Sequence, residues 1–237
     1  MELFLRWSCM SRYLGLVLAR MVMGLIIIGL VFWAVSPNGS GEKEFVRAKQ
    51  ALRSVKSYKY QMIADSKGQQ YHEGSGEMDC QNGDHTTLHI VNTSDPDHPF
   101  DQTTEEIHVT GKGYSRTGEG PWIQMRFIGM APPDPKSECQ ALAAGRAVSS
   151  FPDYDSLIKH AMIGKGDKKT VNGVRCRQWK AVIPHGSNSM PDATTVCLGL
   201  DDHLPYEVHE PYGVHLTYRD FNVPVEIEEP EVASAFN

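Results

Sequence analysis

Hydrophobic and polar positions divide the chain into an apolar N-terminal segment, one amphipathic helix and a long series of strands. In EFVRAKQALRSVKSY, residues 44–58, apolar residues recur every three or four positions with Lys and Arg between them, which predicts an amphipathic helix. From residue 58 onward the dominant period is two. In VHLTYR, residues 214–219, every second residue is apolar, as in a strand with one buried face.

Strand-like segments follow one another at short intervals and are separated by Gly, Asp, Pro and Asn. We expect strands within residues 58–64, 70–80, 86–92, 105–111, 112–116, 121–125, 169–183, 193–200, 204–210 and 213–221. Two short helical segments, residues 137–145 and 153–163, interrupt this series. The order predicts two antiparallel meanders with a helical insertion between them, and it does not fit alternating βαβ units.

The N-terminal segment MVMGLIIIGLVFWAV, residues 21–35, carries no charge but is shorter than the ~20 residues that a transmembrane helix needs. Residues 13–20 extend it if Arg20 reaches toward the lipid headgroups. Arginines before the segment and none directly after it place the N-terminus in the cytoplasm. The alternative is a cleaved signal peptide. We therefore expect a cytoplasmic N-terminus at 1–13, a signal anchor or signal peptide at 14–35, a linker at 36–42, one domain at 43–230 and a tail at 231–237.

Charge argues against one class of partner. The net charge is −6; three arginines and one glutamate give residues 1–35 a charge of +2, so the remainder carries −8. Nucleic-acid binding needs a basic surface that follows the phosphates, so we expect no nucleic-acid partner.

Four of the five cysteines lie beyond the apolar segment, which is the even number that an oxidising compartment favours. Four cysteines allow three pairings. The two strand-like segments that contain Cys176 and Cys197 are joined by a turn-rich stretch, which favours a bond between them and leaves Cys80 to pair with Cys139. Free structural thiols are the alternative, and a metal site lacks the closely spaced CxxC pairs that it normally uses.

Four stretches resemble the superfamily of LolA- and LolB-type lipoprotein carriers, including its mycobacterial lipoprotein branch. They are ALRSVKSYKYQM, TTEEIHVTGKGYSRTGEGPW, TVNGVRCRQWKAVI and LTYRDFNVPVEIEEP, and the resemblance covers about residues 43–230. It implies an α+β fold that is mainly antiparallel β: an unclosed barrel around a hydrophobic cavity that a few helices cover. In such carriers the cavity takes acyl chains. A last strand at the edge of the unclosed barrel would be protected from further pairing by Pro224, Pro230 and the glutamates between them.

Apolar side chains on one face of each strand are the candidates for lining this cavity. They are Tyr58, Tyr60, Met62, Leu88, Ile90, Ile107, Val109 and Trp122. The alternative is that the same faces form a filled core, which every β-domain needs. The apolar loop RFIGMAPP, residues 126–133, is compatible both with contact to a bilayer or client and with packing under the helical insertion.

Candidate chemistry is sparse. The ten histidines are scattered, although His209 and His215 flank one turn and can meet across a hairpin. Asp201 and Asp202 lie in a turn between strands, and neither a GxSxG motif, a P-loop nor a dinucleotide-binding motif is present. We therefore expect no catalytic residues, no metal site and no cofactor.

The resemblance implies non-catalytic binding of a lipid or an acylated protein in the bacterial cell envelope. The main domain would lie in the periplasm, held at the inner membrane by the N-terminal segment or released if that segment is cleaved. The alternative function is an envelope sensor or scaffold that uses the same fold to bind a protein partner.

Overall fold

The computed structural model describes residues 40–65, 70–92, 99–127, 134–146, 151–184 and 192–232. The apolar N-terminal segment, and with it the expected membrane segment, lies outside the described residues, as does most of the loop at 126–133. None of the helices in the described ranges has the length and apolar character needed to cross a membrane.

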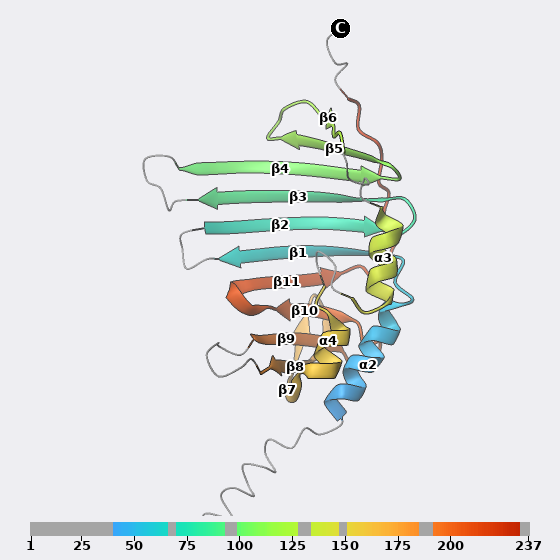
Figure 1. The fold of residues 1–237 in the computed structure, drawn as a ribbon, viewed down its shortest axis with the longest axis vertical. Helices are drawn as coiled ribbons and strands as arrows, with labels where there is room; N and C mark the ends of the chain where they lie inside the picture. Colours follow the sequence, from blue (N-terminus) through green and yellow to red (C-terminus); the bar gives the residue numbers. More distant parts are fainter. Residues whose placement is uncertain are drawn as a thin grey trace, which may run out of the picture. The chain divides into compact units, whose positions relative to one another are not determined.

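Eleven strands form one antiparallel sheet in the order β6-β5-β4-β3-β2-β1-β11-β10-β9-β8-β7 (Figure 1). The first meander contains β1 (Ser57–Asp65), β2 (Gln70–Asp79), β3 (Gly83–Asn92), β4 (Phe100–Val109), β5 (Lys112–Thr117) and β6 (Ile123–Gln124). The second contains β7 (Met162–Val171), β8 (Val174–Ile183), β9 (Asp192–Gly199), β10 (Pro205–His209) and β11 (Val214–Arg219). The sheet is open, because β6 and β7 stand at its two ends. The predicted open antiparallel architecture is confirmed.

The two meanders are joined through β1 and β11, which pair from Lys59↔Arg219 to Ala64↔Val214. On its other side β11 pairs with β10. The last strand is therefore internal to the sheet, and the expectation that the proline-rich tail protects an exposed edge of this strand is wrong.

The segment at 169–183 was expected to be one strand, but it contains parts of β7 and β8. Asn172 and Gly173 form the turn between them, with φ angles of 49° and 81°. Both angles are in the left-handed region, which an Asn-Gly pair adopts readily and which gives a two-residue hairpin. The second helical segment is also shorter than expected, because Met162 already belongs to β7.

Within the described residues, three α-helices accompany the sheet: α2 (Ser40–Leu52), α3 (Pro135–Ala143) and α4 (Tyr154–His160). The side chain of Asp134 caps α3 by accepting from the Lys136 amide, and that of Asp153 caps α4 by accepting from the Ser156 amide. The helix α2 begins within the expected linker and ends at Leu52, before the residues that enter β1.

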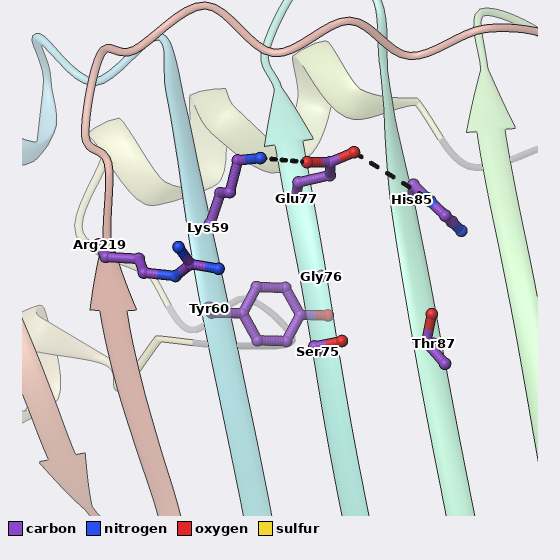
Figure 2. Close-up of a pocket in the computed structure, with 8 residues that line it drawn as sticks. All are labelled: Lys59, Tyr60, Ser75, Gly76, Glu77, His85, Thr87 and Arg219. Carbon is purple, nitrogen blue, oxygen red and sulfur yellow. Dashed lines mark ion pairs between the residues drawn. The ribbon is translucent and has the colours of Figure 1, made fainter.

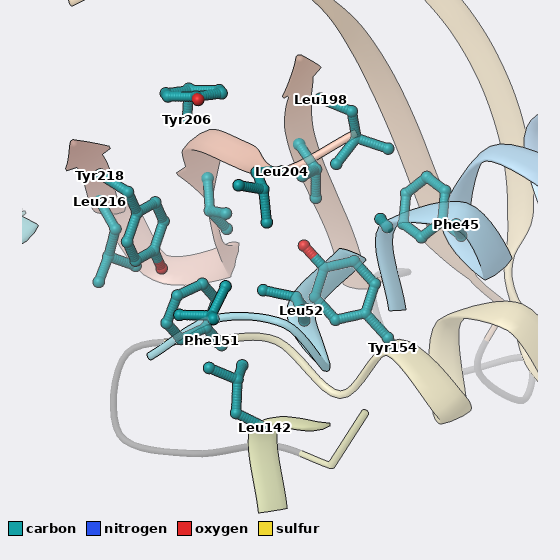
Figure 3. Packing of buried hydrophobic residues seen from close by; sticks show 14 of the residues in the cluster. Phe45, Leu52, Leu142, Phe151, Tyr154, Leu198, Leu204, Tyr206, Leu216 and Tyr218 are labelled. Atoms are coloured by element: carbon teal, nitrogen blue, oxygen red, sulfur yellow. The ribbon is translucent and has the colours of Figure 1, made fainter. Parts of the chain in front are cut away.

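All three helices lie on one face of the sheet, which we call the helix-facing surface; we call the opposite one the outer face (Figure 1). The core fills the space between α2, α4 and the strands around β11, and Figure 3 shows its side chains interdigitated. Phe45, Tyr154 and Tyr218 are fully buried in it. Phe151 stacks on Tyr218 with ring centroids 4.4 Å apart and meets Tyr58 edge-on at 5.1 Å. Each such buried side chain contributes about 1.5–3 kcal/mol to folding, so this half of the surface is a packed core.

Both predicted disulfides are confirmed. Cys80 is bonded to Cys139 of α3 with Cα atoms 5.7 Å apart, and Cys176 to Cys197 with Cα atoms 5.5 Å apart. The first bond joins α3 to the end of β2, and the second links the neighbouring strands β8 and β9.

Candidate functional site

The helix-facing surface continues beyond the core as a row of apolar residues on β1 and β3. Met62 of β1 is opposite Gly74 of β2, and Gly74 is opposite Leu88 of β3. Side chains alternate between faces along a strand, so Tyr60 and Ile90 lie on the same surface. We call Tyr60, Met62, Leu88 and Ile90 the apolar strip. In contrast to the core, all four are only half-buried.

Two glycines of β2 make room for the apolar strip. A Cβ atom on Gly76 would lie 2.5 Å from the Tyr60 ring, and one on Gly74 would lie 3.3 Å from the Met62 Cε atom. The Tyr60 ring therefore rests directly on the backbone of β2, and its hydroxyl is 3.3 Å from the Thr86 hydroxyl. Burial is the main cause that raises the pKa of Tyr60. Two carboxylates, Asp84 of β3 and Glu138 of α3, raise it further by smaller amounts.

The eight residues that the sequence suggested for a cavity are not brought together on one surface. Tyr58 is 1% exposed and belongs to the core, which the apolar strip adjoins. Ile107 is opposite His85, His85 is opposite Glu77, and Glu77 is opposite Lys59. Lys59 alternates with Tyr58 and Tyr60 along β1, so Ile107 lies on the outer face. Val109 lies beside it on the same face, and Trp122 packs against this second cluster together with Ile227.

The C-terminal tail crosses the outer face and explains the proline-bracketed acidic sequence. The Ser57 hydroxyl donates to the Val223 carbonyl at 2.6 Å, and Trp122 forms a parallel bridge with Val232. Between these points, Glu229 accepts from Lys112 at 2.7 Å and from the Tyr114 hydroxyl at 3.0 Å. These two donors hold the pKa of Glu229 below its usual value. The tail is a strap over the first meander.

A shallow polar pocket of about 160 Å³ lies on the outer face, where β11, β1, β2 and β3 are neighbours (Figure 2). The side chains of Lys59, Ser75, Glu77, His85, Thr87 and Arg219 line it from this face, and Tyr60 and Gly76, at the alternating positions, also border it. Lys59 pairs with Glu77 at 2.7 Å, and His85 lies 3.4 Å from Glu105. Three of its strands, β1 to β3, are consecutive, but Arg219 comes from β11, far along the chain, so no local motif predicts the complete pocket.

A second polar cluster is formed by Glu207, His209 and His215 of the β10–β11 hairpin. His209 and His215 are direct partners in the strand pairing, which confirms that the two histidines meet across the turn. Their rings are stacked, with centroids 4.1 Å apart and planes within 6°. Burial opposes ionisation of Glu207, but Lys169, which is paired with it, and the two histidines hold its pKa below the usual value. Burial and the neighbouring His215 lower the pKa of His209.

Solved structures resemble this architecture although their sequences have diverged. LprF from Mycobacterium bovis matches with 11% identity over 82% of this chain and 98% of its own, at a TM-score of 0.58. The chain therefore shares the fold of LprF. At this level of identity the similarity to LprF concerns the fold alone. No protein-family model and no curated protein sequence matches the chain.

Two further solved structures match less well. The MucA/MucB complex of Pseudomonas aeruginosa matches with 13% identity over 83% of this chain and 64% of that chain, at a TM-score of 0.41. A LolA superfamily protein from Nitrosomonas europaea matches with 6% identity over 78% and 94% of the two chains, at a TM-score of 0.26.

Proposed function

We propose that this protein binds the acyl chain of a lipid or of a lipidated client, without catalysis, on the apolar strip of its helix-facing surface. The observation that carries the proposal is the change along this one surface. It is densely packed around Tyr58 and Tyr218 and then continues with apolar side chains that are only half-buried. An acyl chain would complete the burial of these side chains, and each buried CH₂ would contribute about 0.8 kcal/mol.

The chemistry of the strip suits such a ligand. Met62 has a flexible, polarisable side chain that adapts to irregular apolar shapes. The two glycines beneath the strip add no side chains of their own, so the surface that a ligand would contact there is formed by Tyr60, Met62 and Leu88. The half-buried state of the strip supports a ligand surface rather than an extension of the filled core.

The helix α3 is the element best placed to regulate access. Glu138 of α3 is close enough to affect the pKa of Tyr60, after burial and the effects of Thr86 and Asp84, so the helix lies near one end of the strip. Its disulfide to Cys80 keeps the middle of the helix attached to the end of β2. In this proposal α3 acts as the tethered part of a lid.

We further propose that the domain works in an oxidising compartment close to a membrane, in the bacterial cell envelope. The two disulfides support this placement, because such bonds persist outside the cytoplasm. Residues 14–35 would supply the anchor, or a signal peptide if they are removed.

The test is native mass spectrometry of residues Gly39–Asn237, which form a compact unit, after export to an oxidising periplasm and purification without detergent. We expect a bound lipid, identified by organic extraction. Met62→Glu and Leu88→Glu should abolish its binding, because each places a charge on the strip. The matched control is Ile63→Glu, which places the same charge on the outer face, where Ile63 is 39% exposed.

Protein that is empty, and stays empty after incubation with lipid vesicles, would overturn the proposal. A protein partner that co-purifies with such lipid-free protein would instead favour a sensor or scaffold. Equal loss of lipid in Ile63→Glu and Met62→Glu would place the ligand somewhere other than the strip.

A further inference from the structure

Three side chains of metal-ligating type converge on the outer face at the β10–β11 hairpin. The His215 Nε2 atom lies 3.1 Å from one carboxylate oxygen of Glu207, and the His209 Nε2 atom lies 3.4 Å from the other. One potential ligand atom from each residue falls within 4.8 Å of the other two. Each imidazole therefore directs its Nε2 atom toward the carboxylate of Glu207.

The hairpin fixes this arrangement before any ligand arrives. His209 and His215 are paired across the strands, and the Glu210 amide closes the turn by donating to the Val214 carbonyl at 2.8 Å. Gly213 has a φ of 82°, and a Cβ atom there would lie 2.7 Å from the Asp65 carbonyl oxygen. The turn is thus held against β1. Glu207 is two residues before His209 on the same strand and is 8% exposed, so it is fixed as well.

We propose that Glu207, His209 and His215 bind one divalent transition-metal ion, for which we name Zn²⁺. Two imidazoles and one carboxylate are a ligand set that Zn²⁺ uses, whereas Ca²⁺ and Mg²⁺ require mainly oxygen ligands. Three protein ligands leave the fourth tetrahedral position open to water or to a small ligand. The site is on the face opposite the apolar strip, so it is separate from the proposed lipid surface.

Lys169 of β7 is part of the surroundings of this site. Its ammonium group pairs with one oxygen of Glu207, while the His215 nitrogen is nearest to the other. If the metal binds the Glu207 oxygen that faces His215, the ion pair between Lys169 and the other oxygen stays in place. Lys169 then orients the carboxylate without touching the metal. The positive charge of Lys169 weakens the attraction between this site and a cation. Binding therefore depends on the ligand geometry that the hairpin has already fixed.

The experiment uses the full chain in mild detergent after treatment with a chelator. Isothermal titration with Zn²⁺ is expected to show one ion per chain, and His209→Ala and His215→Ala should each weaken binding at least about tenfold. The control is His89→Ala, which removes a histidine that has an exposed carboxylate partner, Asp101, at 2.8 Å. It should bind Zn²⁺ as the parent does.

Two further measurements separate ligand loss from misfolding. Thermal unfolding in chelator should be similar for the parent, His209→Ala and His215→Ala, and Zn²⁺ should raise the melting temperature of the parent and of His89→Ala but not of the other two variants. Electron paramagnetic resonance of the parent loaded with Cu²⁺ should show coupling to two nitrogens. Absence of Zn²⁺ binding, or binding that both alanine variants retain at full strength, would overturn the proposal.

Discussion

Cys80, directly after β2, is covalently bonded to Cys139 in the middle of α3, and the bond closes a loop with a sequence separation of 59 residues. It connects the first meander to the helical insertion. The Cys176–Cys197 bond instead joins two strands that are already hydrogen-bonded neighbours. The two disulfides therefore have different consequences when they are removed.

We predict that the double variant Cys80→Ser with Cys139→Ser loses about 4 kcal/mol of stability, because a long loop is no longer closed in the unfolded chain. Both cysteines are half-buried, so serine fits in their place. Urea unfolding gives the magnitude, and hydrogen exchange shows where it acts. Amides of residues 135–143 should lose protection while those of β8 and β9 keep theirs. Unchanged protection of α3 would contradict its assignment as a tethered lid.

The pair of His108 and Asp84 predicts a pH dependence of stability. The His108 Nδ1 atom lies 3.0 Å from Asp84, and both side chains are 13% exposed. The hydrogen bond to Asp84 raises the pKa of His108, burial opposes it, and Glu106 on β4 and Glu138 on α3 add to the increase. A raised pKa in the folded state means that the stabilisation is fully present below the ordinary pKa of about 6.5 and is lost as the pH rises through the raised value.

The measurement is the free energy of unfolding between pH 5 and pH 8.5 for the parent and for His108→Gln. Their difference should be about 1 kcal/mol at the acidic end and should shrink toward the alkaline end. His89→Gln is the control, because its partner Asp101 is 75% exposed. A difference that grows as the pH rises would have the wrong sign for a raised pKa.

Local patterns predicted the strands well because the alternation of apolar and polar residues is a local signal. The alternation in residues 214–219 matches the burial of Leu216 and Tyr218 in β11. The boundary of β7 and β8 was missed although Asn172 and Gly173 carry a hairpin signal, because the residues on both sides continue the alternation. The role of the tail was missed for a different reason: its partners Lys112 and Tyr114 lie more than 100 residues away, and sequence spacing carries no information about them.

The candidate sites were predicted less well than the fold. Alternation assigns residues of one strand to two faces, but it does not say which face of one strand joins which face of another. Ile107 and Leu88 both alternate correctly, yet the register of β3 and β4 places them on opposite faces. His209 and His215 could be paired in advance because a short hairpin fixes their register, whereas Glu207 became their partner only once its orientation was known.

We predict that Tyr154→Phe stabilises the protein by about 1 kcal/mol. Tyr154 is 0% exposed, and its hydroxyl has no hydrogen-bond partner within the described part of the chain. In Figure 3 it points into the apolar core. Burial raises the pKa of this phenol, so its unbonded hydroxyl stays neutral and is the only group that the substitution removes. Urea unfolding measures the change, with Tyr206→Phe as the opposite case, because Tyr206 donates to Asp202 at 2.6 Å and should lose stability. A destabilised Tyr154→Phe would mean that the hydroxyl has a partner.

The strap formed by the tail predicts the effect of truncation. Val225 is 8% exposed, and Ile227 packs against Ile107, Val109 and Tyr114. A chain that ends at Pro224 keeps the Val223 carbonyl that accepts from Ser57 but uncovers this second cluster. We expect a loss of about 2–4 kcal/mol in urea unfolding, the contribution of one buried and one half-buried apolar side chain.

Hydrogen exchange should locate this loss in β4 and β5, whose residues form the cluster, and leave β8 and β9 protected. A chain that ends at Val232 is the matched control, because it keeps every described contact of the tail and should unfold as the parent does. Ile227→Asp in the full chain separates lost packing from lost backbone. This substitution leaves the Glu229 contacts available but places a carboxylate against Tyr114 and Val109. It should therefore cause most of the stability loss that the truncation at Pro224 causes. If Ile227→Asp unfolds as the parent does, the tail is held by its polar contacts alone and the strap does not form part of the core.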